Sequence, residues 1–342
     1  MSKLKHALAH TTCVTVLLVF GTGPAWSEQE PKKNQANPWD MSPTAAPFTT
    51  PDSSISVGVG YLDGQRQQLG TFDGQRSSHG SLLFDAKIIK RDEATGTWIT
   101  TQGRNLGMDS NREVKVDLER QGEWGFRVDY NEIPRVTPYS VNSKTEGLGT
   151  TTQTIPKTTT SGDGATVQIR TDRERVSLNT FRALNSKIKF NLNFRNETKE
   201  GTRQWGRGGS NEFALEPVDW TIRQLEPTLS FTGDRLQLLG GYNGSWFRNE
   251  NNLVDTILKG NNPATLTNHA YLTLPLNNEA HQIFLGGGYH FTPDTRGTFK
   301  ISYSRALQNE HIPTTDITGL SIPNAPSSLQ GRVDNTLLQL GL

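Results

Sequence analysis

Apolar and polar residues alternate along many short segments of the chain. In the stretch KIKFNLNFRNETK, which covers residues 187–199, the apolar members are Ile188, Phe190, Leu192 and Phe194. The polar members are Lys187, Lys189, Asn191, Asn193 and Arg195. Because successive side chains of a β-strand point to opposite faces, this pattern predicts a strand with one apolar face and one polar, charged face.

The same alternation recurs elsewhere in the sequence. In REVKVDLER, apolar residues at 114, 116 and 118 alternate with Glu113, Lys115, Asp117 and Glu119. In TFKISYS, Phe299, Ile301 and Tyr303 alternate with Lys300 and two serines. From Ser54 onward we count about twelve such segments, most of them roughly 9–13 residues long. Segments of this length are closer to tilted membrane strands than to the strands of a soluble sheet.

Short turns and long connections follow one another along the chain. The short turns are QG, ALNS, TGD and TPDT, all rich in residues that favour hairpins. The long connections hold about 40 residues after Tyr130 and about 25–30 after Lys199, Phe247 and Ala306. Their Ser, Thr, Asn and Gly content, as in TTTQTIPKTTTSGDG, predicts solvated loops. Short turns at one end and long loops at the other are typical of an antiparallel transmembrane β-barrel in the outer membrane.

A barrel assigns a solvent to each face of the strands. The residues expected to face lipid are Ile188, Phe190, Leu192, Phe194, Ile301 and Tyr303. The residues expected to line the lumen are Glu113, Lys115, Asp117, Lys187, Lys189, Asn191, Asn193, Arg195 and Lys300. Trp124, Tyr130, Trp246 and Phe247 lie near predicted strand ends, where a barrel places aromatic girdles; the alternative is that they are ordinary core aromatics.

The N-terminus has the features of a secretory signal peptide. Lys3 and Lys5 precede the apolar run at 14–20, and Ala25-Trp26-Ser27 fits a cleavage site between Ser27 and Glu28. We therefore expect a signal peptide at 1–27, a flexible periplasmic leader at 28–53 and an outer-membrane β-barrel, incomplete or small, at 54–342. No run approaches the ~20 apolar residues of a spanning helix, and mean hydropathy is −0.59. This excludes a helical membrane protein.

Charge and cysteine usage restrict the chemistry further. Loss of Lys3 and Lys5 with the signal peptide changes the formal net charge from +1 to −1, which gives no reason to expect a nucleic-acid partner. The only cysteine, Cys13, is lost as well, so the mature chain has no thiolate and no haem-attachment motif. The histidines lack zinc-like spacing, and GRGGS at 206–210 lacks the lysine of a phosphate loop. We therefore expect that the protein is not an enzyme and that it has no metal site and no cofactor of its own. A serine hydrolase stays open as an alternative, because a triad is defined by geometry.

Several phrases of the sequence resemble the MtrB/PioB family of decahaem-associated outer-membrane β-barrels. They are REVKVDLERQGEWGFRVDYNEIP, DRERVSLN, LNSKIKFNLNFRNETKEGTR, EPVDWTIRQLEPTLSFTGDRLQLLGGYNGSWFRNE and LPLNNEAHQIFLGGGYHFTPDTRGTFKISYSRALQNE. Their order along the chain makes the resemblance fairly specific. It covers most of residues 54–342 and corresponds to about the N-terminal half of a typical member. The Cys-x-x-Cys pair that some members carry near the mature N-terminus is absent here.

The resemblance implies a porin-like sheath in the outer membrane of a Gram-negative bacterium. Such a sheath encloses a periplasmic multihaem c-type cytochrome, with an extracellular cytochrome as a further implied partner, and supports electron transfer during metal reduction or oxidation. Haem would then belong only to the partner. Three alternatives remain: a general or solute-specific diffusion porin, a truncated and non-functional family member, and a secreted soluble β-protein. A neighbouring gene for a protein with many Cys-x-x-Cys-His motifs would favour the sheath.

Overall fold

The computed structural model describes residues 16–19, 52–64, 68–72, 79–108, 110–156, 163–206, 213–259, 268–315, 319, 321–324 and 327–342. The predicted cleavage site at Ser27–Glu28 and most of the predicted leader lie outside these residues. The strands are β1 (Val16–Val19), β2 (Ser54–Leu62), β3 (His79–Asp92), β4 (Thr97–Arg104), β5 (Glu113–Arg120), β6 (Trp124–Ser143), β7 (Thr152–Ile155), β8 (Ala165–Ala183), β9 (Ile188–Gly206), β10 (Phe213–Thr232), β11 (Leu236–Asn249), β12 (Leu253–Leu258), β13 (Asn268–Thr273), β14 (Asn278–Thr292), β15 (Thr295–Gln308) and β16 (Gly331–Gly341). One short 3-10 helix, Leu69–Thr71, follows β2.

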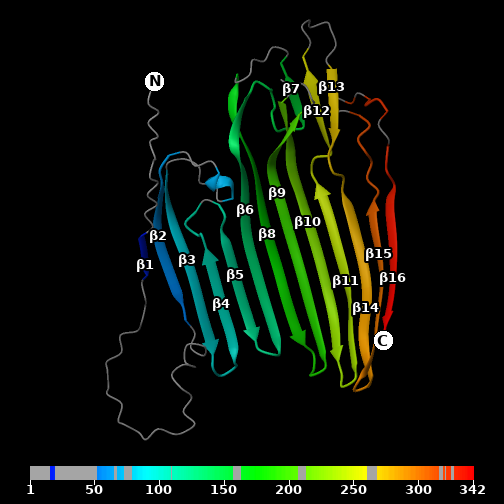
Figure 1. Ribbon diagram of the computed structural model, residues 1–342. Helices are drawn as coiled ribbons and strands as arrows, with labels where there is room; N and C mark the ends of the chain where they lie inside the picture. The colour runs from blue at the N-terminus through cyan, green and yellow to red at the C-terminus, as the bar shows by residue number, and fades with distance from the viewer. Residues whose placement is uncertain are drawn as a thin grey trace, which may run out of the picture.

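One large antiparallel sheet makes up most of the molecule (Figure 1). Its thirteen strands lie in the order β1-β2-β3-β4-β5-β6-β8-β9-β10-β11-β14-β15-β16. The first of them, β1, falls inside the predicted signal peptide and pairs with β2. Twelve strands remain from β2 onward, so the all-β fold and the expected strand count are both confirmed.

The short turns all lie at one end of the sheet, at the bottom of Figure 1. All four predicted hairpins form, namely β5–β6, β8–β9, β10–β11 and β14–β15. Local polar contacts shape these turns. Gly122 in the QG turn adopts a φ of 80°, which favours glycine. In the ALNS turn, the Asn185 side-chain oxygen accepts hydrogen bonds of 2.8 Å from the backbone N–H groups of Lys187 and Ile188.

The central strands are longer than the sequence pattern predicts. β6 and β10 have 20 residues each, and β8 and β9 have 19, against the expected 9–13. A tilted strand crosses a bilayer with ~9–11 residues, so about half of each central strand extends beyond the membrane-spanning length. The connections are correspondingly shorter than predicted, because β6 continues to Ser143 and β9 to Gly206.

The long connections after Tyr130 and Phe247 are not simply solvated, so the expectation of solvated loops was wrong for these two. Strands β7, β12 and β13 form a second sheet at the far end, in which β12 pairs parallel with β7 and antiparallel with β13. This small sheet contacts β10. Leu215 of β10 and Ile155 of β7 each have only 1% of their surface exposed. Gln153 is fully buried and satisfied: its side-chain oxygen accepts from the Leu215 N–H at 3.0 Å, and its amide donates to the Thr150 carbonyl at 2.9 Å.

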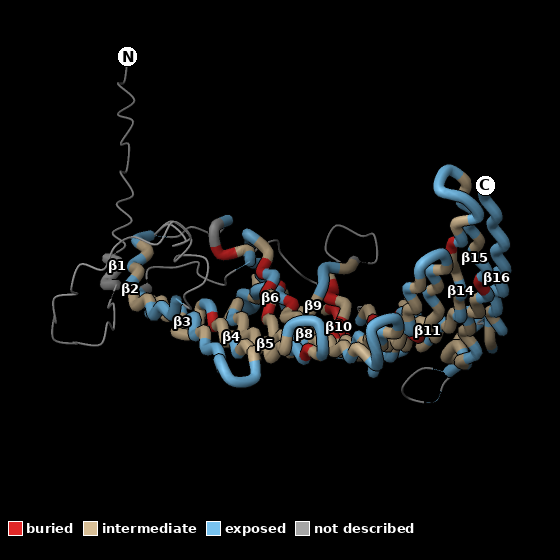
Figure 2. The backbone as a smooth tube through the Cα atoms, turned by 90° about the horizontal axis from the view of Figure 1, so that it is seen from below, coloured by how far each residue is buried: buried red, intermediate tan, exposed pale blue. Residues whose placement is uncertain are grey.

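The large sheet curves but stays open (Figure 2). Within the described residues, β16 pairs only with β15, and β2 pairs only with β3 and β1. The helical part of the described chain offers no segment with the length and apolar character needed to cross a membrane.

Candidate functional site: the polar concave face

Strand register divides the large sheet into two chemically distinct faces. Asn193 of β9 pairs with Asn179 of β8 and Glu226 of β10, which places three polar side chains on one face. On the opposite face, Phe194 pairs with Leu178 and Leu225. The two-residue alternation is therefore in phase across neighbouring strands, and each face is continuous.

The polar face is the concave one. A broad depression of about 910 Å³ is lined by residues contributed by strands from β5 to β16. Its polar members include Asp129, Arg175, Asn193, Gln224 and Asn335. A depression that crosses so many strands can lie only on the inner side of a curved sheet, and Figure 2 shows the curvature.

The apolar face is exposed along the whole sheet. Ile283 has 59% of its surface exposed and Leu338 67%, while Val59 and Leu229 are exposed to a similar degree. A soluble protein rarely exposes a contiguous apolar surface of this size, because its contact with water is unfavourable. The face therefore requires a covering environment.

Most residues predicted to line the lumen lie on the polar face. Asn193, Arg195 and Glu113 line the depression itself. Asp117 accepts a 2.8 Å hydrogen bond from Arg127 Nε, and Lys115 lies opposite Asp129. The remaining members with strand positions on this face are Lys189, Asn191 and Lys300. Lys187 is the exception: it lies in the β8–β9 turn before β9 begins, so strand geometry does not assign it to either face. Whether this face encloses a lumen stays a prediction.

The residues predicted to face lipid share the apolar face. Phe190 pairs with Leu229, and Ile301 pairs with Leu285 and Leu338. Ile188, Leu192 and Phe194 continue this face along β9. Tyr303 differs from the others in its surroundings. Its hydroxyl donates to Asp334 at 2.7 Å and accepts from Arg305 at 2.7 Å, so the apolar face ends there in a polar cluster.

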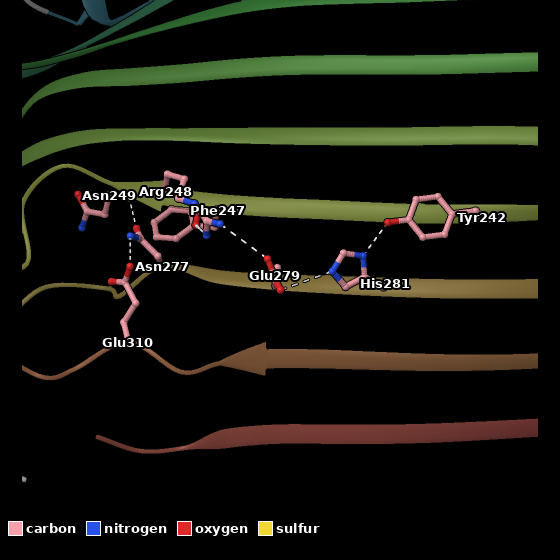
Figure 3. Close-up of polar contacts among 8 residues, drawn as sticks. All are labelled: Tyr242, Phe247, Arg248, Asn249, Asn277, Glu279, His281 and Glu310. Carbon is pink, nitrogen blue, oxygen red and sulfur yellow. Dashed lines mark hydrogen bonds and ion pairs between the residues drawn. The ribbon is translucent and has the colours of Figure 1, made fainter. Parts of the chain in front are cut away.

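A second group of polar contacts lies on the apolar face, in the outer halves of β11 and β14 (Figure 3). The Tyr242 hydroxyl lies 2.6 Å from His281 Nδ1. Glu279 lies between His281 and Arg248, at 3.7 Å from each. Trp246 packs edge-on against His281, with ring centroids 5.6 Å apart. This mixture of aromatic and charged groups is the composition expected at a membrane–water boundary.

The four aromatic residues predicted to lie in girdles occupy different positions along the strands, and they do not all lie on the same face. Trp124 begins β6 at the end with the short turns, and Trp246 lies near the outer end of β11. Tyr130 is an interior residue of β6, because that strand continues to Ser143. Phe247 was misassigned. It follows Trp246 directly, so it points to the concave face, where its ring centroid lies 5.9 Å from that of Trp220.

The polar face carries cation–aromatic pairs that sequence reasoning missed. The Lys189 ammonium lies 4.1 Å from the ring centroid of Phe181, and the Arg91 guanidinium lies 5.1 Å from that of Trp98. Lys199 lies 5.7 Å from Trp220 in the same way. Each pair joins neighbouring strands, so it depends on a register that the sequence pattern does not specify.

Charges crowd the outer part of this face. Glu197 is buried and ion-paired with Arg195, and it also lies 3.7 Å from Arg173. Lys199 is the twelfth residue of β9, beyond the length needed to cross the bilayer. Burial, followed by the nearby positive charges of Arg203, Arg135 and Arg173, lowers the pKa of Lys199. On β8, hydrogen bonds to Asp172 raise the pKa of Arg170.

Among the described residues, no three His, Cys, Asp or Glu side chains gather as metal ligands would. One histidine contact was not predicted from the sequence, because it joins two paired strands, β12 and β13. His269 of β13 contacts the fully buried Asp255 of β12, with Nδ1 at 2.9 Å from the carboxylate. It lies in the small outer sheet, outside the polar face.

A long-stranded antiparallel sheet with one polar concave face and one exposed apolar face belongs to the class of outer-membrane β-barrel proteins. Residues 61–342 match the family of outer membrane beta-barrel porins, MtrB/PioB, and the chain belongs to that family. Its location is the outer membrane.

One curated relative is "Outer membrane protein MtrB" of Shewanella baltica (strain OS185). It is 26% identical over 299 residues, which cover 84% of this chain and 42% of the relative. The chain thus spans less than half the length of that relative. Among solved structures, in-vitro folded OmpT of Vibrio cholerae aligns with 84% of this chain and 74% of its own, at 10% identity and a TM-score of 0.35. A loop-deletion variant of OmpT aligns with 74% of this chain and 70% of its own, at 10% identity and a TM-score of 0.32. Scores this low do not define a shared topology.

Proposed function

We propose that the chain forms part of the wall of an outer-membrane sheath, which encloses a periplasmic multihaem c-type cytochrome and supports electron transfer across the outer membrane. The single observation that carries the proposal is the continuous polar concave face from β5 to β16. A wall that holds another protein needs hydrogen-bonding and charged groups on its inner surface. The haem cofactors belong to the partner, and the sheath itself is not an enzyme.

Membership of the MtrB/PioB family supports this proposal. The charge distribution supports it as well, because ion pairs such as Asp117–Arg127 keep the inner surface polar without a large net charge. A protein partner needs a wide enclosure, since interior width grows with strand number. The twelve strands of the large sheet from β2 to β16 would supply one part of such an enclosure.

Cys13 is the only cysteine of the sequence and lies in the predicted signal peptide, so a single introduced thiol would be a unique labelling site once that peptide is removed. We propose to compare Asn193→Cys, on the concave face, with Leu192→Cys, on the apolar face. Each variant would be joined to a short photoactivatable crosslinker in intact outer membranes. The sheath proposal expects a haem-stained adduct from Asn193→Cys and none from Leu192→Cys. Haem adducts from both positions, or from neither, in correctly inserted protein would contradict the proposal.

A diffusion porin is the second candidate, favoured by the same polar depression if water and solutes fill it. It predicts ion conductance in planar bilayers from protein that carries no haem stain. A sheath occupied by its partner should conduct poorly, because the partner fills the lumen. Conductance before and after removal of haem-bearing protein therefore separates the two functions.

A further inference from the structure

A separate pocket lies on the concave face above the main depression, at the outer ends of β9, β10 and β11. We call it the Lys199 pocket. Its volume is about 440 Å³, within the usual range for small-molecule sites. The lining residues that matter here are Lys199, Arg203, Trp220, Ile222, Phe247 and Asn278.

The pocket combines an aromatic wall with apolar surroundings. The ring centroids of Trp220 and Phe247 lie 5.9 Å apart at an interplanar angle of 49°, and both rings line the pocket. Ile222 and Val218 extend the apolar surface beside them. A purely ionic ligand would not use this wall, whereas a ligand with a planar apolar part would.

The charge in the pocket is not balanced by its carboxylates. Arg203 donates a 2.9 Å hydrogen bond to Glu216, which neutralises one cation. Glu197 is shared between Arg195 and Arg173. Among the described residues, Lys199 has no ion pair, and its ammonium lies 5.7 Å from the centroid of the Trp220 ring. The negative charge of Glu197 offsets only part of the positive charge around it.

A crowded, partly buried cation without a counter-ion favours an anionic ligand. The nearby Arg203, Arg135 and Arg173 add positive potential at Lys199. An incoming carboxylate would relieve this repulsion and accept hydrogen bonds from the ammonium. Because the site lies beyond the membrane-spanning length of β9, such a ligand could reach it from the outer side of the membrane.

We propose that the Lys199 pocket binds small aromatic carboxylates, with the ring against Trp220 and Phe247 and the carboxylate on Lys199. This inference goes beyond the proposed sheath function. It concerns a small solute, and its test measures binding of that solute and uses no haem signal.

The test uses full-length protein extracted from outer membranes in mild detergent and equilibrium dialysis with benzoate. Two ligand controls need no variant: benzamide keeps the ring but loses the charge, and acetate keeps the charge but loses the ring. We expect saturable benzoate binding that is about tenfold tighter than that of either control. Equal binding of benzoate and benzamide, equal binding of benzoate and acetate, or no saturable binding would overturn the proposal.

Variants locate the site within the protein. Lys199→Gln should weaken benzoate binding about tenfold, and Trp220→Leu should weaken benzoate more than acetate. Lys189→Gln is the matched control, because Lys189 also lies over an aromatic ring, that of Phe181, on the same face of the same strand but outside the pocket. An equal loss in Lys189→Gln and Lys199→Gln would assign binding to general surface charge and contradict the proposal.

Discussion

Leu192 and Asn193 are neighbours on β9, yet they meet opposite surroundings. Leu192 lies on the apolar face and Asn193 lines the polar depression. Near the midplane of a bilayer, an arginine on the lipid side of a barrel costs about 2–4 kcal/mol. We therefore expect Leu192→Arg to lower the free energy of folding into lipid by about that amount, and Asn193→Arg to change it little. Urea titration of folding into lipid vesicles measures both.

These two substitutions control for each other, since they add the same side chain at adjacent positions. Equal destabilisation would mean that the two faces meet similar environments. A larger effect at Asn193 would reverse the face assignment.

Gly201 on β9 adopts a φ of +126°, where side chains are strained. A Cβ built there would lie 2.2 Å from the Arg170 carbonyl oxygen of β8. We expect Gly201→Ala to destabilise the outer part of the sheet by about 1–3 kcal/mol. The measurement is the rate at which an external protease cuts β8 and β9 in whole cells.

Gly240 offers a contrasting glycine on β11. A Cβ there would be 3.3 Å from a flexible Leu285 methyl group and 3.6 Å from the nearest backbone oxygen. Gly240→Ala should therefore leave protease resistance nearly unchanged, and a loss equal to that of Gly201→Ala would refute the strain argument.

At the scale of elements, the small outer sheet is held against β10 by Gln153. Its side chain bonds both the N–H and the carbonyl of Leu215, and all of these groups are buried. Gln153→Ala leaves them without partners, at a cost of about 1–3 kcal/mol. We expect faster proteolysis of β7 and β12 on whole cells, with the large sheet still inserted. Thr154→Ala, in a half-buried neighbour, is the control; if it behaves like Gln153→Ala, the bonds to Leu215 are not the cause.

The sequence predicts the strands well in the part of the sheet where one face is apolar and the other polar. From Ser54 to Leu342, two-residue alternation and turn residues were enough to predict the all-β fold, four hairpins and about twelve strands. The pattern failed in the outer half of β10, FALEPVDW. There Ala214, Leu215 and Val218 are all buried, because the small sheet covers a part of the strand that would otherwise be exposed. Alternation is lost where both faces are covered.

The Lys199 pocket was also beyond sequence reasoning. Its main groups come from three strands, with Lys199 on β9, Trp220 on β10 and Phe247 on β11. Lys199 and Trp220 meet because the two strands pair residue for residue over their whole length. A shift of one residue would separate them, and nothing in either strand alone defines that register.

At the scale of the whole molecule, the large sheet has two free edges. The outer edge of β16 has no partner among the described residues, and the edge of β2 that faces away from β3 becomes unpaired if β1 is removed with the signal peptide. In lipid, unpaired backbone N–H and C=O groups cost several kcal/mol each. We therefore expect residues 28–342, expressed alone, to fold poorly in detergent or lipid. The measurement is heat-modifiability on gels together with protease resistance.

A sharply heat-modifiable, protease-resistant monomer would contradict this expectation, because it would require β2 and β16 to pair with each other and close a small barrel. Fusion to additional strands, or addition of a chain that supplies them, should restore folding if the edges are the cause.

The large sheet has twelve strands from β2 to β16, and this even number has a consequence for how such a sheet can change in size. The first strand leaves the end of the sheet that carries the short turns, and the last strand returns to it. A block of this kind can be duplicated, inserted or deleted without inverting any other strand, since antiparallel order is kept at both junctions. Gene rearrangement in whole hairpins could therefore widen or narrow such walls while the orientation of every loop is preserved.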